Sequence, residues 1–204
     1  MNKVLHVNLD LPSEESHRLT ALQSAVADVC NALTPIVQQS RCWNRVGLHH
    51  LAYRDMRERF PHVGSQMICN AIYAVSRTCK LLLQNPLSPF SLNLNQDKPL
   101  PLLRFLPNSP VYFDRHTLSI KSRQLSMYTL NGRIKFEVAL TNDDAALFTR
   151  QRLREIVLNR FGDNFRLSFY FSPNEQPQIS HTAAPTDTFP DYVNVISPET
   201  ILNA

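Results

Sequence analysis

The sequence lacks the short motifs and long runs that define several large classes of protein. It has only four glycines in 204 residues, and they are too scattered to form a glycine-rich phosphate-binding loop. Its four cysteines form no CxxC pair and no Cys/His zinc pattern. No apolar run approaches the roughly 18 residues needed to cross a membrane. We therefore expect a reduced, intracellular protein with no membrane partner, no cofactor and no metal.

Two small groups of polar side chains could still carry chemistry. Cys42, His49 and His50 lie close in sequence, but adjacent helical residues point about 100° apart and no fourth ligand is evident. Asp114 and His116 lie in a strand-like segment and could share one face, as a catalytic dyad requires. Surface hydrogen bonding is the simpler interpretation of this second group. We predict no catalytic residue.

The charges are distributed unevenly along the chain. Residues 41–141 contain fourteen basic and five acidic residues, a net charge of +9, whereas residues 173–204 contain four acidic residues and no Lys or Arg. A concentrated basic segment is typical of a surface that binds phosphate groups. A solvated basic face without a partner explains the same charge equally well, so charge alone leaves both interpretations open.

The first part of the chain predicts one strand followed by three helices. Residues 4–11 alternate between apolar and polar, as a half-buried strand does. Ser13 is a suitable N-cap, and apolar residues then recur at helical spacing up to a stop near Pro35 or shortly after it. A second helix is expected over residues 46–60. A third helix follows, with a buried stripe made of Ile68, Ala71, Ile72, Val75, Cys79 and Leu82.

The second and third helices each have a polar face. On the second helix His50, Arg54 and Arg57 lie opposite the apolar residues. Cations, amides and aromatic rings on such faces suit RNA phosphates and exposed bases. An ordinary amphipathic surface helix shows the same pattern, and the residues alone favour that simpler interpretation. The polar face of the third helix consists of Gln66, Asn70, Tyr73, Arg77 and Lys80.

The second part of the chain predicts an irregular connection followed by strands and one helix. Residues 85–110 contain six prolines and no periodicity, which predicts a long irregular connection. Strand patterns then flank Asn131-Gly132, as in a β-hairpin with a tight turn. An Asp-rich start at residues 142–144 predicts a helix that reaches about Phe161. Residues 165–171 alternate as a final strand, and the polar chain beyond has little to bury.

Two segments carry the most informative motifs, LHHLAYRDMRERFPHVGSQMICNAIYAVSR at residues 48–77 and VYFDRHTLSIKSRQLSMYTLNGRIKFEVAL at residues 111–140. In order and spacing they resemble the amino-terminal half of the TnpB (OrfB) family of transposon-encoded RNA-guided nucleases, which are relatives of the type V CRISPR effectors. The resemblance implies an α+β fold in which a small β-barrel, the wedge domain, is interrupted by a helical recognition domain of about three helices.

The resemblance also implies a division of the chain. It assigns residues 1–12 to the first barrel strand and residues 13–85 to the helical recognition domain. Residues 86–110 become a linker, and residues 111–172 become the remainder of the barrel with one helix. Residues 173–204 become a flexible acidic tail, a remnant of the family's first nuclease strand or else a random tail.

The expected remnant strand lacks a metal ligand. In the family the first catalytic aspartate lies in a pattern like GVDxG, and here Ile196 of DYVNVIS occupies the matching position. Isoleucine cannot bind a divalent metal. The resemblance therefore implies a nuclease-dead protein that holds a structured or guide RNA in the prokaryotic cytoplasm or at the nucleoid, for DNA targeting, repression or assembly with a separate protein subunit.

The expected RNA contacts come from both segments. Lys and Arg would neutralise phosphates, and Tyr73 and Tyr128 would stack on bases. The alternative is a protein-interaction module that has kept the fold but not RNA binding, and an enzyme with an unrecognised site has the least support. The expected RNA-binding residues are His50, Arg54, Arg57, Asn70, Tyr73, Arg77, Lys80, Arg115, Lys121, Arg123, Tyr128, Arg133 and Lys135.

Overall fold

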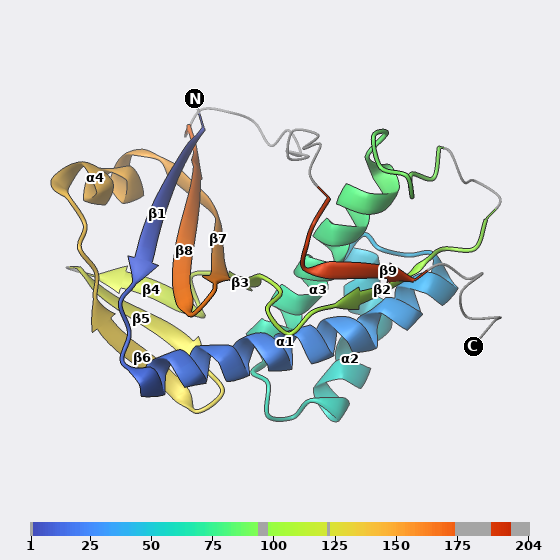
Figure 1. The fold of residues 1–204 in the computed structure, drawn as a ribbon, viewed down its shortest axis with the longest axis horizontal. Coiled ribbons are helices and arrows are strands. Elements are labelled where there is room, and N and C mark those ends of the chain that lie inside the picture. Colours follow the sequence, from blue (N-terminus) through green and yellow to red (C-terminus); the bar gives the residue numbers. More distant parts are fainter. Residues whose placement is uncertain (1, 94–97, 122, 174–188, 197–204) are drawn as a thin grey trace. The chain divides into compact units, whose positions relative to one another are not determined.

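A computed structural model describes residues 2–93, 98–121, 123–173 and 189–196 (Figure 1). The chain divides into two compact units. Unit 1 comprises residues 1–23 and 110–179, and unit 2 comprises residues 24–109 and 180–204. The mixture of helices and strands confirms the α+β class. Within the described residues no helix is long and apolar enough to cross a membrane.

A four-stranded antiparallel sheet organises unit 1. Its order is β1 (Lys3–Leu9), β8 (Asn164–Ser172), β7 (Arg152–Phe161) and β3 (Val111–Phe113), and β1 lies beside β8 in Figure 1. One face of this sheet is the core of the unit, because successive strand residues point to opposite faces. The buried residues of that face are Val7, Leu9, Val111, Phe113, Ile156, Leu158, Phe165, Leu167, Phe169 and Phe171.

A second sheet of unit 1 has three strands. The order is β4 (Leu118–Lys121), β5 (Gln124–Thr129) and β6 (Gly132–Glu137), and both pairings are antiparallel. The described strands thus form separate sheets, none of them closed, and the barrel expected from the resemblance is not confirmed.

The helix expected from residue 142 to about Phe161 is only half correct. The structure has α4 (Asn142–Arg150) followed by β7. The acidic start does form a capping box, in which Thr141 Oγ1 accepts from the Asp144 backbone N–H and the Asp144 carboxylate accepts from the Thr141 N–H. Beyond it, β7 is paired along its length with β8. Long-range pairing of a β-branched segment therefore outweighs local helical spacing.

Unit 2 is mainly helical. α1 (Ser13–Ser40) contributes residues to both units, α2 (Arg45–Arg59) and α3 (Ser65–Cys79) follow, and a π-helical turn, η1 (Lys80–Gln84), extends α3. α1 continues through Pro35 and ends shortly after it, at Ser40. Proline removes one N–H donor, but the Thr34 hydroxyl donates to the Asn31 carbonyl at 3.2 Å, which is the acceptor that this N–H would have used.

α3 is a buried helix rather than a surface helix. Ten of its fifteen residues are buried, including Asn70, whose side chain was expected on an open polar face. The amide of Asn70 donates to Met67 Sδ at 3.8 Å. Two thiols belong to this core: burial raises the pKa of the Cys30 thiol above its ordinary range and raises the pKa of Cys79 to about 12.

The segment expected as an irregular linker contains a strand. β2 (Leu102–Phe105) pairs antiparallel with β9 (Val193–Ile196). Asn31 holds β2 from the side, because its Oδ1 accepts from the Phe105 N–H at 2.7 Å and its Nδ2 donates to the Phe105 carbonyl at 3.0 Å. Residues 193–196 of the expected tail are therefore a paired strand, whereas residues 174–188 and 197–204 lie outside the described residues.

Removal of one core ring tests the packing of unit 1. Phe169 is fully buried, and its ring meets that of Phe148 of α4 edge to face with centroids 5.3 Å apart. We expect Phe169→Ala to lower the free energy of unfolding by about 3–5 kcal/mol in urea denaturation followed by circular dichroism. Val4→Ala on β1, where Val4 is 45% exposed, is the control and should cost less than about 1 kcal/mol. Equal losses would contradict this assignment of the core.

Candidate nucleic-acid interface

The three-stranded sheet has one buried and one open face. The register places Leu118, Leu125 and Met127 on the buried face. Side chains of alternate parity point the other way, and these are polar, aromatic or charged. We call this surface the outer face, and its residues are Ser119, Lys121, Gln124, Ser126, Tyr128, Arg133, Lys135 and Glu137.

The outer face and its adjoining turns are strongly basic. Residues 115–137 contain five Lys or Arg residues and a single acidic residue, Glu137. Arg115 and Arg123 lie at the two ends of β4 and are exposed, as are Lys121 and Lys135 on the strands. Within the described residues no ion pair joins any of these cations to a carboxylate. The positive charge is therefore not neutralised locally.

Arg133 is fixed in position without losing its charge. Its Nε donates to Ser126 Oγ at 2.8 Å and one terminal nitrogen donates to the Ser126 carbonyl at 2.7 Å. The other terminal nitrogen donates to the His116 carbonyl at 3.1 Å. The guanidinium thus spans from β6 over β5 to the turn before β4. All three acceptors are neutral, so a fixed cation remains on the outer face.

Tyr128 adds an aromatic ring to the same surface. It lies directly opposite Arg133 in the pairing of β5 with β6 and is half-buried. An aromatic ring beside cations on an open antiparallel sheet is an arrangement that proteins use to bind single-stranded nucleic acid, because the ring stacks on a base while the cations contact phosphates.

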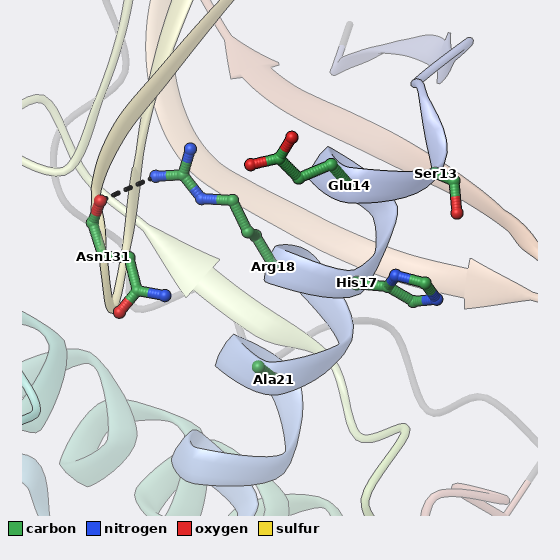
Figure 2. Close-up of a pocket in the computed structure, with 6 residues that line it drawn as sticks. All are labelled: Ser13, Glu14, His17, Arg18, Ala21 and Asn131. Atoms are coloured by element: carbon green, nitrogen blue, oxygen red, sulfur yellow. Dashed lines mark hydrogen bonds between the residues drawn. The ribbon is translucent and has the colours of Figure 1, made fainter.

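The first turns of α1 brace the hairpin that carries Arg133 and Lys135 (Figure 2). One terminal nitrogen of Arg18 donates to Thr129 Oγ1 at 2.7 Å, to the Asn131 carbonyl at 2.9 Å and to the Gly132 carbonyl at 3.3 Å. Sequence patterns do not indicate this role, because Arg18 lies more than a hundred residues before its partners and matches no local motif.

The turn of this hairpin lies one residue earlier than expected. Leu130 and Asn131 form the turn, and Gly132 begins β6 opposite Thr129. Gly132 has φ +89°, a backbone conformation that residues other than glycine rarely adopt. The Asn131-Gly132 pair therefore predicts the hairpin correctly but places its turn one residue too late.

The candidate residues of the helices all belong to unit 2 and are in mixed environments. His50, Arg54 and Lys80 are exposed, although Arg54 pairs with Glu58 at 3.1 Å. The Arg57 guanidinium donates to the Val63 carbonyl and thereby closes the turn between α2 and α3.

The remaining candidates on α3 are less accessible. The Arg45 guanidinium lies over the ring of Tyr73, 5.2 Å from its centroid. Arg77 is half-buried and has a polar or electrostatic partner, and Asn70 is buried. The helices therefore present isolated cations, whereas the outer face presents a continuous set within one unit.

The two minor groups of polar residues have structural explanations. Asp114 Oδ1 accepts from the backbone N–H groups of His116 and Thr117 and from the Thr117 hydroxyl. It therefore stabilises the turn before β4 rather than forming a dyad with the His116 ring. His49 stacks on Tyr53, with ring centroids 4.6 Å apart. No group of three or more potential metal ligands occurs in the part of the chain that the structure describes.

No family model and no curated protein sequence matches this chain.

Loss of the Arg18 donors should loosen the hairpin. We expect Arg18→Met, which keeps the aliphatic stem, to speed amide hydrogen exchange at Gly132 and Ile134 about ten-fold or more, because hydrogen bonds from a charged donor are lost. Arg115→Met makes the same change of charge at an exposed turn of the same unit and should leave this exchange unchanged. Equal acceleration in both variants would argue against the brace.

Proposed function

We propose that this protein binds RNA and holds an unpaired segment of it across the outer face of the β4–β5–β6 sheet. The observation that carries the proposal is the set of cations on and around this face, none of which is neutralised by a carboxylate in the described residues. Phosphate groups would supply the missing negative charge. The resemblance of residues 48–77 and 111–140 to the RNA-holding half of TnpB nucleases points to the same class of ligand.

The arrangement of the outer face favours a single strand over a duplex. Tyr128 lies on the central strand β5, directly opposite Arg133 on β6, and Lys135 and Lys121 lie farther along the same face. An unpaired base can stack on such a ring, whereas the bases of a duplex are already stacked on one another. The structured RNA implied by the resemblance would therefore present a loop, bulge or end to this face.

In this proposal the protein positions RNA and performs no cleavage itself. The held RNA would serve as a guide for DNA targeting or repression, or as the scaffold on which a separate subunit assembles. The residues assigned to phosphate contact are Arg115, Lys121, Arg123, Arg133 and Lys135, and Tyr128 is assigned to base stacking.

Charge removal on the outer face tests the proposal. Lys121→Gln with Lys135→Gln should weaken binding of a labelled single-stranded RNA, measured by fluorescence anisotropy over a series of salt concentrations. The magnitude of the slope of log K against log salt should fall by about 1.4, because each lost contact with a single strand removes about 0.7. Both lysines are exposed, so folding should be unaffected.

The matched control makes the same change of charge on the helices. Arg54→Gln with Lys80→Gln alters two exposed residues of unit 2 and should leave the salt slope as it is in the unaltered protein. A fall in slope for the helix variant alone would show that RNA binds the helices of unit 2 rather than the outer face. Absence of RNA binding, together with a protein partner whose affinity is insensitive to salt, would instead favour the interaction module.

A further inference from the structure

A hollow of about 420 Å³ lies at the end of the four-stranded sheet. Its lining comes from the end of β1 and from the hairpin that joins β7 to β8: Asn8, Leu9, Asp10, Phe161, Asn164, Phe165 and Arg166. The volume falls within the range of about 300–1,000 Å³ that is usual for small-molecule sites. All of these residues belong to unit 1.

The register brings four of the lining side chains to one face of the sheet. Asn8 lies opposite Arg166, and Phe161 lies opposite Asn164. Because Arg166 and Asn164 are two residues apart on β8, all four share the face that is opposite to buried Phe165. Side chains from three strands therefore meet at this end of the sheet.

Phe161 and Arg166 both line the hollow and form a cation–π pair, which we call the platform. The Phe161 ring is 52% exposed, and the Arg166 guanidinium carbon lies 4.2 Å from the centroid of the ring, which is a close cation–π contact. In the described part of the chain no ion pair joins Arg166 to a carboxylate. An exposed ring with a planar cation over it is a surface on which another flat ring can stack.

Polar groups with unused hydrogen-bonding capacity surround the platform. The side chains of Asn8, Asp10 and Asn164 are exposed, and none of them makes a hydrogen bond or ion pair within the described residues. The two amides can each donate and accept, and the carboxylate accepts only. The hollow thus combines a stacking surface with polar groups at its edge, which is what a nucleobase requires.

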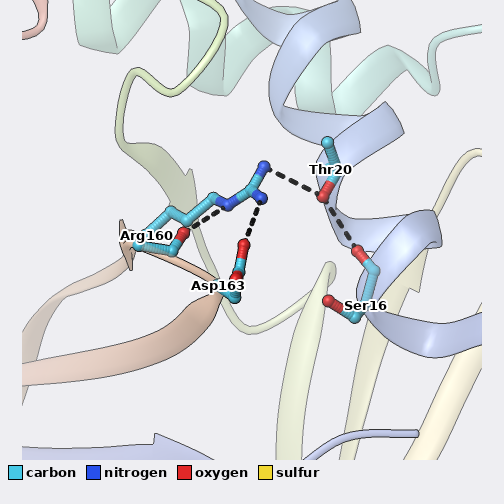
Figure 3. A network of polar contacts seen from close by, with 5 residues as sticks. Ser16, Thr20, Arg160 and Asp163 are labelled. Carbon is cyan, nitrogen blue, oxygen red and sulfur yellow. Dashed lines mark hydrogen bonds and ion pairs between the residues drawn. The ribbon is translucent and has the colours of Figure 1, made fainter. Parts of the chain in front are cut away.

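Polar contacts of Arg160 support the hairpin that carries the platform (Figure 3). Arg160 Nε donates to the Gly162 carbonyl at 2.8 Å, and its terminal nitrogens contact Asp163 Oδ1 at 3.4 Å and Thr20 Oγ1 at 3.3 Å. Gly162, with φ +59°, provides the positive φ that the first residue of this two-residue turn requires. The platform is therefore formed before any ligand arrives.

We propose that this hollow binds one unpaired guanine base, stacked on the Phe161–Arg166 platform with its Watson–Crick edge toward Asp10. Guanine alone among the four bases has two adjacent N–H donors on this edge, and a carboxylate with two acceptor oxygens matches them. Adenine and cytosine place an acceptor beside their donor, which the carboxylate repels. The inference rests on the proposed function, because the base would belong to the bound RNA.

Titration with single nucleotides tests the hollow separately from RNA binding. Guanosine, adenosine, cytidine and uridine monophosphates are added one at a time to the full chain, and the backbone amide signals of Gly162 and Asn164 are followed by NMR. We expect guanosine monophosphate to shift these signals and to bind about ten-fold more tightly than adenosine monophosphate, the usual gain from one bidentate pair. No shift at the hairpin, or equal affinity for all four, would overturn the proposal.

Three variants separate the roles of the ring and the carboxylate. Phe161→Leu should weaken binding of guanosine monophosphate about ten-fold because the stacking ring is lost, whereas Phe161→Tyr keeps the ring and should bind as before. Asp10→Asn should abolish the preference for guanosine over adenosine monophosphate while both still bind. A preference that survives in Asp10→Asn would overturn the assignment of the Watson–Crick edge.

The variant Lys121→Gln with Lys135→Gln distinguishes this proposal from the proposed function. It should bind guanosine monophosphate normally, since neither lysine lines the hollow, while its RNA binding weakens. Normal RNA binding by this variant, together with shifts at the hairpin, would count against the outer face and still support the hollow. Loss of guanosine monophosphate binding in this variant would instead count against the hollow as an independent site.

Discussion

The pairing of β1 with β8 is the constraint on which unit 1 depends. It joins two strands that lie far apart in the sequence, from Lys3 opposite Phe171 to Leu9 opposite Phe165. α1 begins directly after β1, so the position of β1 determines where Arg18 and Thr20 lie. Arg18 then contacts the β5–β6 turn, and Thr20 contacts Arg160 of the β7–β8 hairpin. One long-range pairing thus positions the supports of both proposed binding surfaces.

The two proposed surfaces of unit 1 would bind RNA through different kinds of interaction. The outer face of the three-stranded sheet offers several cations, and attraction to phosphate is long-ranged, weakened by salt and indifferent to sequence. The hollow at Phe161 offers one stacking site and one carboxylate, whose interactions are short-ranged and depend on the chemistry of the base. The outer face would therefore supply affinity for RNA, and the hollow would supply selectivity for the base.

Local patterns in the sequence predict those elements whose residue spacing or turn chemistry is visible within a single segment. α2, α3 and the β5–β6 hairpin follow from helical spacing and from a glycine suited to a positive φ. Lys121 and Lys135, which the resemblance implies as RNA contacts, are exposed on strands of the outer face. The failures arise from distant partners. The local pattern predicts a helix over β7 because its pairing with β8 leaves no local signal. It predicts a linker over β2 because the partner strand β9 lies some ninety residues later. Arg18 and the Phe161–Arg166 platform were missed because only the folded sheets bring their parts together.

The cysteines have a consequence for how the helical unit can be observed. Cys30 and Cys79 are buried, and burial raises the pKa of both thiols, so almost no reactive thiolate exists at neutral pH. Cys42 and Cys69 are partly accessible. Alkylating reagents should therefore modify the second pair at once and the first pair only when the helices separate. The labelling rate of the two buried thiols therefore reports how often unit 2 opens. It gives the local free energy of that opening without any added probe.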